Sequence, residues 1–403
     1  MTGYRPRELA QIIVEALKNM PVVVISGMRQ TGKSTLLLNQ TELKRRKYIN
    51  LDDFNTLEAI KRGSESLISG KEPITIDEAQ RYPDIFQIIK MEIDKNRKPG
   101  KFLLSGSANF LLLKNISESL AGRAVYFTLH PFTRREISKK TRDIPAFINF
   151  IKKGTFPKND EKEISLQEIR KGGMPSVCLG EVKNSDIWFH EYEQTYLERD
   201  IRNLSQVADL VSFRHLMRLI ALRNTQIFKQ SELARDAKLN VVTTSRYVSL
   251  MESSFILKRI HPYLGNRSSR LIKSPKVYFS DTGLASHLAG IRSAISPLYG
   301  ALFENYVYQN LEGILSTYYP EADIAYWNIQ GRYEVDFIIE IGNETIAIEV
   351  KSSSRWKEPD LIGIKTFLNT SRRCRAGILA YNGKEVLRLE DKIWAVPIHL
   401  LLS

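Results

Sequence analysis

The stretch that decides the fold is Gly27-Met28-Arg29-Gln30-Thr31-Gly32-Lys33-Ser34. An apolar run from Val22 to Ser26 enters it, and an apolar helix pattern that begins Ser34-Thr35 continues from it. Between a strand and a helix, a G-x-x-x-x-G-K-S loop turns consecutive backbone N–H groups toward phosphates. Lys33 then reaches the β and γ phosphates, and the Ser34 hydroxyl is offered to Mg²⁺. The stretch therefore predicts a P-loop that binds ATP with Mg²⁺.

A second apolar run, Ile74 to Asp77, ends in the acid pair Asp77 and Glu78. This order predicts that Asp77 lies near the metal and that Glu78 polarises the attacking water. An acidic helix start after a strand would also explain Glu78, but it would not explain both motifs in the correct order. Together the two motifs predict a Mg²⁺-dependent ATPase.

Two further features of the same region have two interpretations each. Ser107 and Asn109 follow a strand pattern, where AAA-type ATPases carry a polar sensor near the γ-phosphate, but a turn that caps the next helix would use the same residues. Arg123 precedes the last strand pattern, the position from which such ATPases project an arginine into a neighbouring subunit's site. That role requires a homo-oligomer, for example a ring. The alternative is a surface arginine that offsets a helix dipole.

The composition is typical of a soluble globular protein with several domains. The 403 residues exceed what one hydrophobic core usually serves. With 43% hydrophobic and 26% charged residues, and no apolar stretch near the roughly 20 residues that cross a bilayer, no membrane span is expected. The N-terminus lacks a signal-peptide pattern, which predicts a cytoplasmic protein. Cys178 and Cys374 lie far apart in sequence, so neither a disulfide framework nor a thiolate zinc site is expected.

The formal net charge of +14 predicts a polyanionic partner. Lys and Arg side chains that neutralise phosphates release counterions and gain affinity, so nucleic acid is the leading candidate. A generally basic proteome or a membrane surface would explain the charge as well.

The pattern along the chain predicts an α/β protein with several parts. Short β-rich runs alternate with helical patterns up to about Leu129, which indicates a parallel sheet wrapped by helices. Strands are expected at 22–26, 47–51, 74–77, 101–105 and 124–129. The predicted parts are a P-loop AAA-type core (1–130), a lid or connector (131–165), a helical linker (166–226), a winged helix-turn-helix (227–281) and a second α/β domain (282–403).

The winged-helix prediction rests on two short helix patterns followed by two strand patterns. The second helix would be the recognition helix, with Thr243, Thr244 and Arg246 toward a DNA groove and Tyr247, Leu250 and Met251 in the core. Strands are expected in 255–262 and 270–279, with 265–269 as their turn. The basic residues of this hairpin would contact phosphates; they are Arg267, Arg270, Lys273 and Lys276. An ordinary solvated hairpin is the alternative.

The C-terminal part carries a strand pattern through Asp336, a Gly342-Asn343 turn and a second strand pattern that ends Glu349-Val350-Lys351. With a period of two, Glu349 and Lys351 share one face of their strand. Two carboxylates and one lysine suit metal-assisted phosphodiester cleavage, in which Asp336 and Glu349 bind Mg²⁺ and Lys351 orients or activates water. The pattern is similar to the core of PD-(D/E)xK nucleases, and that similarity implies Glu304 as a fourth member. A hairpin with solvated charges is the alternative, and a nuclease fold can also bind DNA without cutting it.

As an ensemble, these segments resemble the family of prokaryotic and archaeal AAA-type ATPases that carry a C-terminal DUF4143 domain. The matching pieces run nearly end to end and include Tyr4 to Arg7, Gly27 to Ser34, Tyr48 to Asp53, Asp77 to Gln80, Ala121 to Arg123, Gly172 to Pro175, Tyr196 to Asp200, Ser274 to Leu284 and Glu334 to Asp336. The resemblance implies an ATPase with a DNA-related C-terminal module.

Three functional hypotheses follow. In the first, ATP hydrolysis repositions the winged helix and a restriction-endonuclease-like domain on duplex or branched DNA. In the second, the ATP state gates DNA or partner binding and nothing is cut. In the third, the protein is a protein-remodelling ATPase of the STAND or chaperone kind, which DNA neither binds nor stimulates.

Overall fold

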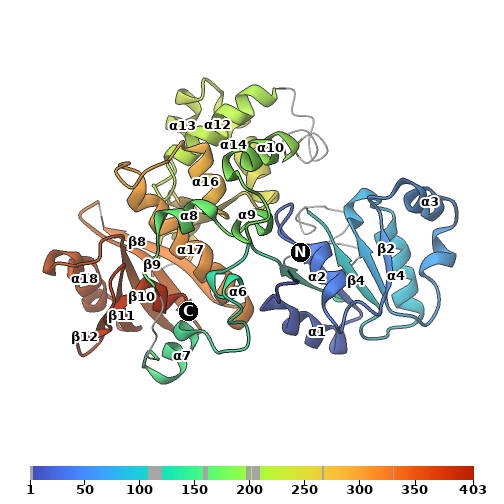
Figure 1. The fold of residues 1–403 in the computed structure, drawn as a ribbon, viewed down its shortest axis with the longest axis horizontal. Helices are drawn as coiled ribbons and strands as arrows, with labels where there is room; N and C mark the ends of the chain where they lie inside the picture. The colour runs from blue at the N-terminus through green and yellow to red at the C-terminus, as the bar shows by residue number, and fades with distance from the viewer. Residues whose placement is uncertain are drawn as a thin grey trace. The chain divides into compact units, whose positions relative to one another are not determined.

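The computed structural model describes residues 3–107, 120–157, 162–196, 201, 209–265, 267–329 and 331–403. The chain divides into two compact units, which Figure 1 shows in one view. The first comprises residues 1–130 with 253–255, and the second residues 131–252 with 256–403.

The first unit is built on a five-stranded parallel sheet in the order β2-β3-β4-β1-β5. All five expected strands are confirmed, with ends that differ by at most one residue. They are β1 (Val22–Ser26), β2 (Lys47–Asn50), β3 (Ile74–Asp77), β4 (Phe102–Ser105) and β5 (Ala124–Thr128). Because the strands are parallel, β1, β3 and β4 end at the same edge of the sheet.

Helices cover both faces of this sheet (Figure 1), which explains why its strands are nearly all apolar. Val23 and Ile25 pack on one face against α1 (Leu9–Asn19) and α2 (Lys33–Asn39). Val22 and Val24 face the other way, as the period of two requires, and pack with α3 (Phe54–Ile68) and α4 (Ile85–Lys95). A short 3₁₀ helix, η1 (Ala79–Arg81), follows β3.

The second unit begins with helices. In chain order they are α6 (Arg134–Ile137), α7 (Ala146–Lys153), α8 (Leu166–Lys171), α9 (Pro175–Cys178), α10 (Ser185–Thr195), α12 (Leu210–Leu222), α13 (Gln230–Asp236) and α14 (Val241–Ser253). The helix-turn-helix expected from the sequence corresponds to α13 and α14. Of the three residues expected in its core, Tyr247 and Met251 are buried, whereas Leu250 is only partly buried.

The hairpin expected after α14 differs from the prediction in its second half. Strand β6 (Leu257–Ile260) pairs antiparallel with β7 (Lys276–Phe279), but the segment Arg267–Ile272 forms a helix, α15, instead of turn and strand. Arg270 is therefore helical. Its guanidinium pairs with both oxygens of Glu340 and lies 4.6 Å from the ring centroid of Tyr263. Arg270 thus pairs with a residue 70 positions further along the chain.

Two of the segments that carry the family resemblance, Gly172 to Pro175 and Ser274 to Leu284, contact each other at the start of α16 (Thr282–Leu288). Asp281 is buried, caps this helix at the Leu284 N–H, and accepts a 2.7 Å hydrogen bond from the Gly173 N–H. Burial raises the pKa of the Asp281 carboxyl to about 6, although backbone N–H groups oppose the shift. A Cβ on Gly283 would lie 2.4 Å from the Phe189 ring, so the position accepts only glycine without rearrangement.

The last part of the chain is a six-stranded mixed sheet in the order β12-β13-β11-β10-β9-β8. The long helix α17 (Tyr299–Tyr318) precedes it, and α18 (Ile362–Thr370) follows a 3₁₀ turn, η4 (Glu358–Leu361). The other elements are β8 (Asp323–Ile329), β9 (Tyr333–Ile341), β10 (Glu344–Lys351), β11 (Cys374–Tyr381), β12 (Leu387–Glu390), β13 (Ile393–Pro397) and α19 (Ile398–Leu401). The antiparallel β9–β10 hairpin is confirmed.

Within the described ranges, none of the helices is both long and apolar enough to span a bilayer.

Candidate functional site

The loop between β1 and α2 has the backbone that a phosphate cradle requires. Gly27 has φ +148°, and a Cβ there would lie 2.4 Å from the Leu129 carbonyl oxygen. Gly32 has φ +92°, and Gln30 also lies in the left-handed region at +61°. These conformations favour glycine and cost a residue with a side chain of order 1–3 kcal/mol. The loop geometry is thus imposed by the surrounding structure.

The Lys33 ammonium is held by the backbone of this loop. Its Nζ donates 2.9 Å hydrogen bonds to the carbonyl oxygens of Gly27 and Met28, and its side chain is buried. The loop is closed by Thr31, whose hydroxyl donates to the Met28 carbonyl at 2.8 Å. Arg7, from the N-terminal segment, donates to the Thr31 carbonyl at 2.7 Å. Arg29 and Ser34 are partly exposed, and Thr35 is exposed.

Asp77 lies at the end of β3, beside this loop's edge of the sheet, and is almost completely buried. Tyr48, on β2, donates a 2.6 Å hydrogen bond to Asp77 Oδ2. Ser105, at the end of β4, donates to Oδ1, which also accepts the Glu78 N–H at 3.0 Å. Three neighbours therefore orient this carboxylate. Burial, followed by the hydrogen bond to Asp77, raises the pKa of Tyr48, so its hydroxyl stays protonated and remains a donor.

Glu78 stands next to Asp77 with φ +54°, a left-handed conformation that is uncommon for a residue with a side chain. Burial raises the pKa of its carboxyl, while the charge of Lys33 opposes the shift. Gln80 donates a 2.5 Å hydrogen bond to Glu78 Oε2 and a 3.3 Å hydrogen bond to the Ser107 hydroxyl. Ser107 is thereby linked to the candidate base. The other sensor candidate, Asn109, lies outside the described residues.

Arg123 lies at the opposite end of the sheet from the P-loop. The strand that follows it pairs in register from Val22 with Ala124, so the arginine lies level with Pro21, roughly 20 Å along the strand from Gly27 at 3.3 Å per residue. Its guanidinium pairs with Asp94 at 2.7 Å and donates to the Ala121 carbonyl. Arg123 therefore has no place in the nucleotide site of its own chain.

ATP and Mg²⁺ fit the residues of the first unit. The left-handed glycines give the loop the turn that directs N–H groups toward phosphates, and Lys33 supplies a cation. Ser34 and Asp77 offer the hard oxygen ligands that Mg²⁺ prefers.

A second group of charged side chains gathers at α17, β9 and β10. Lys351 Nζ lies 2.7 Å from Glu349 Oε1, and the Val350 N–H donates a 2.9 Å hydrogen bond to Asp336 Oδ2. The hydroxyl of Tyr278, on β7, donates to Glu304 Oε1 at 2.5 Å. All four residues expected for the nuclease-like constellation, Glu304, Asp336, Glu349 and Lys351, thus belong to one partly buried cluster with mutual electrostatic interactions.

Lys276 also lies in this cluster, contrary to its expected place on an exposed wing. Its side chain is only 5% exposed, and its Nζ lies 2.5 Å from Glu334 Oε1, 3.4 Å from Glu304 Oε1 and 3.7 Å from Asp336 Oδ1. Burial by itself would lower the pKa of Lys276, but these carboxylates raise it. The lysine is therefore a buried, charged ammonium.

Burial dominates the titration of the acids as well. It raises the pKa of Glu304, of Asp336 and of Glu349. For Glu304 and Glu349, the neighbouring Asp336 carboxylate adds to the rise, whereas Lys276 and Lys351 respectively oppose it.

Mg²⁺ does not fit this cluster as it is arranged. One oxygen of Asp336 accepts the Val350 N–H and the other faces the Lys276 ammonium. Glu349 Oε1 is paired with Lys351, which leaves Oε2 of Glu349, buried and without a hydrogen-bond partner among the described residues. The Lys276 ammonium already lies among the carboxylates of Glu304, Glu334 and Asp336, and its positive charge would repel a divalent cation placed there.

Only some of the residues predicted to contact DNA are exposed in the structure. Thr244 is completely buried, and its hydroxyl donates to the Asn240 carbonyl, so it cannot reach a groove. Arg270 forms an ion pair with Glu340, and Lys276 forms ion pairs with the acids of the C-terminal cluster. Arg246 and Lys273 are exposed and Thr243 is partly exposed. The backbone of Arg267 lies in α15, not in a turn.

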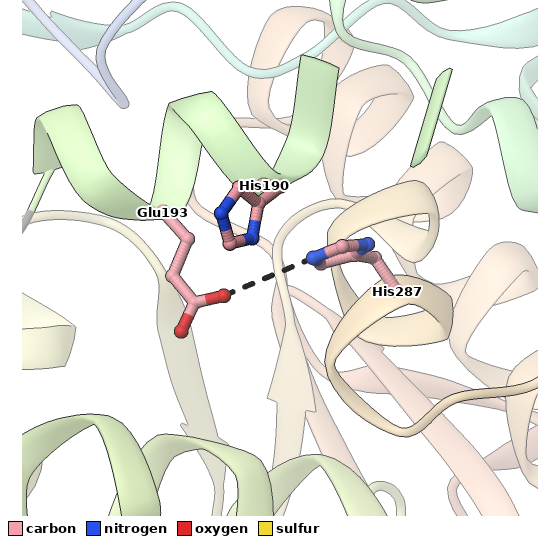
Figure 2. Close-up of side chains that lie close together, drawn as sticks. All are labelled: His190, Glu193 and His287. Carbon is pink, nitrogen blue, oxygen red and sulfur yellow. Dashed lines mark ion pairs between the residues drawn. The ribbon is translucent and has the colours of Figure 1, made fainter. Parts of the chain in front are cut away.

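A third cluster joins His190, Glu193 and His287, shown in Figure 2. Their ligand atoms lie within 4.8 Å of one another, and they are the only such triad among the residues that the structure describes. The donor types match a zinc site. However, Arg214 and Arg218 lie 3.2 and 3.4 Å from the Glu193 carboxylate, which is fully buried. Burial would raise the pKa of Glu193, but His287 and the two arginines hold it below its usual range. The cluster is thus an ion-pair network that joins α10, α12 and α16.

Sequence reasoning missed several members of these sites. Tyr48 and Ser105 contact Asp77, and Tyr278 and Glu334 belong to the C-terminal cluster. Period-two spacing was an available signal, because Glu334 and Asp336 share one face of β9, as Lys276 and Tyr278 share one face of β7.

Three family models match successive parts of the chain. An AAA domain matches residues 19–138, a domain of unknown function (DUF8612) residues 163–294, and a domain of unknown function (DUF4143) residues 299–401.

Relatives match over most of the chain. An uncharacterized protein of Mycobacterium tuberculosis is 29% identical over 404 residues, covering 98% of this chain and 84% of the relative. An uncharacterized protein of Haemophilus influenzae is 23% identical over 352 residues, covering 82% of each.

Solved structures of ATPases are similar at lower identity. A Walker-type ATPase of Pyrococcus abyssi is 16% identical, with a TM-score of 0.40, over 70% of this chain and 94% of that one. The RuvB Holliday junction branch migration motor of Thermotoga maritima is 17% identical, with a TM-score of 0.30, over 62% of this chain and 87% of that one. The chain thus carries a match to an AAA domain in its N-terminal part, where the P-loop and the five-stranded parallel sheet lie, and a match to DUF4143 in its C-terminal part.

Proposed function

We propose that this protein is a Mg²⁺-dependent ATPase that binds DNA and uses the ATP cycle to change how its C-terminal part holds duplex or branched DNA. The observation that carries the ATPase assignment is the convergence of the P-loop, Asp77 and Glu78 at one edge of a parallel sheet. This convergence joins a phosphate cradle to an oriented acid pair.

Each residue has a defined task in this proposal. Lys33 turns from the carbonyl oxygens of its own loop to the β and γ phosphates, while Ser34 and Asp77 hold Mg²⁺. The bound ion supplies charge neutralisation on the phosphates. Glu78, held by Gln80, accepts the proton of the attacking water or orients that water.

Two observations support DNA as the partner. The net charge of +14 favours a polyanion, and the helix pair α13–α14 presents Arg246 to solvent. A protein-remodelling ATPase would share the P-loop but would show no response to DNA.

The second candidate is an ATP-gated switch that binds DNA or a protein partner and does not cut. It is favoured by the surroundings of Asp336, which accepts the Val350 N–H at Oδ2 and lies 3.7 Å from the Lys276 ammonium at Oδ1. In a metal-dependent nuclease, a cation at Asp336 would have to lie beside this ammonium, and the two like charges would repel each other.

The central experiment measures ATP turnover with and without linear, circular and branched DNA. Wild type should hydrolyse ATP, DNA should change the rate, and Lys33→Ala should abolish it. A rate that no DNA form alters, together with no DNA binding, would support the protein-remodelling alternative instead.

A salt titration tests the DNA contacts directly. Each phosphate contact adds about −0.9 to the slope of log K against log salt, so Arg246→Ala should make the slope shallower by about one. Lys18→Ala, which removes an exposed lysine paired with Glu15, is the matched control. A flat salt response of the wild type would contradict the DNA proposal.

A cleavage assay separates a nuclease from a non-cutting switch. Incubation with Mg²⁺ or Mn²⁺ should nick one of the DNA forms if the C-terminal domain is a nuclease, and Asp336→Ala should abolish that nicking. Intact DNA throughout would leave the non-cutting switch.

A further inference from the structure

Lys276 brings a cation into the C-terminal cluster from a different part of the chain. It lies on β7, the strand that pairs with β6 after the helix-turn-helix, whereas the carboxylates lie on α17 and β9. Tyr278 is two residues further on β7, on the same face, and its hydroxyl donates to Glu304. Strand β7 therefore inserts an ammonium and a hydroxyl into one cluster of acids.

The surroundings of the Lys276 ammonium match those of a bound cation. Three carboxylates lie within 3.7 Å of Nζ, and the ring centroid of Tyr326 lies at 5.6 Å. A buried ammonium is stable only when it is paired, and the buried Asp336 and the largely buried Glu304 need a positive charge in turn, whereas Glu334 is exposed. Lys351 does not balance the charge of these three carboxylates, because its ammonium is paired with Glu349.

We propose that Lys276 is the resident cation of this carboxylate cluster, in the place of a catalytic metal, and that it thereby keeps the DUF4143 domain free of metal while joining β7 to α17 and β9. Oδ2 of Asp336 accepts the Val350 N–H, so Oδ1 is the oxygen that accepts no hydrogen bond among the described residues. That oxygen faces the ammonium, and two cations in one small space repel each other. The inference does not depend on ATP hydrolysis or DNA binding.

The proposal predicts what happens when the ammonium is removed. In Lys276→Met, a side chain of similar length carries no charge. The negative charge of the three carboxylates is then no longer balanced by the ammonium. Asp336 Oδ1 and the unpartnered Glu349 Oε2 then become available as ligands. The variant should gain a divalent metal site that the wild type lacks.

The test titrates full-length, nucleotide-free protein with Mn²⁺ and follows free Mn²⁺ by electron paramagnetic resonance. Wild type should bind no Mn²⁺ that Asp336→Asn removes. Lys276→Met should bind one additional ion at least roughly tenfold more tightly than the wild type binds any, and adding Asp336→Asn or Glu349→Gln should abolish it.

Two controls separate charge from shape and position. Lys276→Arg keeps the positive charge and should remain metal-free. Lys273→Met removes an exposed lysine three residues earlier and should behave as wild type.

Two results would overturn the proposal. One is a wild-type Mn²⁺ site that is lost in Asp336→Asn while Lys276 is present. The other is a folded Lys276→Met protein that binds no more Mn²⁺ than the wild type. If Lys276→Met does not fold, the wild-type titration and the effect of Mn²⁺ on wild-type melting decide, since a resident lysine predicts no stabilisation through Asp336.

Discussion

At the scale of single residues, Glu78 combines a left-handed backbone with a carboxyl whose pKa is raised by burial above its usual 4.5. A general base works only when ionised, so ATP turnover should increase as the pH rises through this raised pKa. The acidic limb of the kcat profile should therefore lie above pH 4.5. A kcat profile that is flat across the acidic range would argue against Glu78 as the base.

Glu78→Gln gives the matched variant for this limb. It keeps a side chain of the same shape but cannot accept a proton, so kcat should fall roughly 10²–10⁴-fold while ATP binding persists. The acidic limb that belongs to Glu78 should disappear from any residual activity. Fluorescent nucleotide binding, measured beside turnover, distinguishes this loss from a loss of the site.

Tyr48 orients Asp77 through a 2.6 Å hydrogen bond. Tyr48→Phe removes only the hydroxyl, so the apparent Mg²⁺ affinity in turnover assays should weaken roughly tenfold, as for other residues that orient a metal ligand. Tyr82→Phe, at a tyrosine that packs against the sheet core, is the control and should leave the Mg²⁺ titration unchanged. Equal Mg²⁺ titrations for both variants would refute the role of Tyr48.

At the scale of secondary-structure elements, α16 packs closely on its neighbours at Gly283. An added Cβ would meet the Phe189 ring at 2.4 Å and the Lys171 carbonyl oxygen at 2.9 Å. Gly283→Ala should therefore lower the free energy of unfolding by about 1–3 kcal/mol, the usual cost of overpacking. Denaturant unfolding measures it.

The control is Gly300→Ala, in α17, where nothing lies within 4 Å of the added methyl. Alanine is favoured over glycine in a helix by about 1 kcal/mol, so this variant should be neutral or slightly stabilised. A loss of stability in Gly300→Ala as large as in Gly283→Ala would contradict the steric explanation.

The element that sequence reasoning placed wrongly is the second half of the expected hairpin. The prediction gave a turn at 265–269 and a strand from 270, and the structure has the helix Arg267–Ile272 there. The ion pair of Arg270 with Glu340 and its contact with the Tyr263 ring act at a distance along the chain that no local pattern reports. By contrast, β1 to β5 were predictable, because their apolar runs and turns are local.

At the scale of the whole molecule, Arg123 lies too far from the P-loop of its own chain to act there. If it completes the site of a second copy, Arg123→Ala should lose ATP turnover by roughly 10³-fold or more, the usual contribution of an arginine finger. Mixing Arg123→Ala with Lys33→Ala subunits should restore part of the activity, because one interface then contains an intact P-loop and an intact arginine.

Turnover by the wild type should also depend on protein concentration through the range in which it assembles. Full activity of Arg123→Ala would show that the arginine only pairs with Asp94. Circular dichroism of each variant verifies that it is folded.

By itself, the sequence determined the P-loop, the acid pair at the end of β3, and the pairing of β9 with β10. These features depend on residues that are neighbours in the chain, where glycine conformation and strand period act directly. Only the tertiary structure decided that Tyr48 and Ser105 hold Asp77, that Thr244 is buried, and that Lys276 lies among acids instead of on a wing. Burial and charge pairing join segments far apart in sequence, so the same lysine can be a DNA contact or an internal cation until the fold places it.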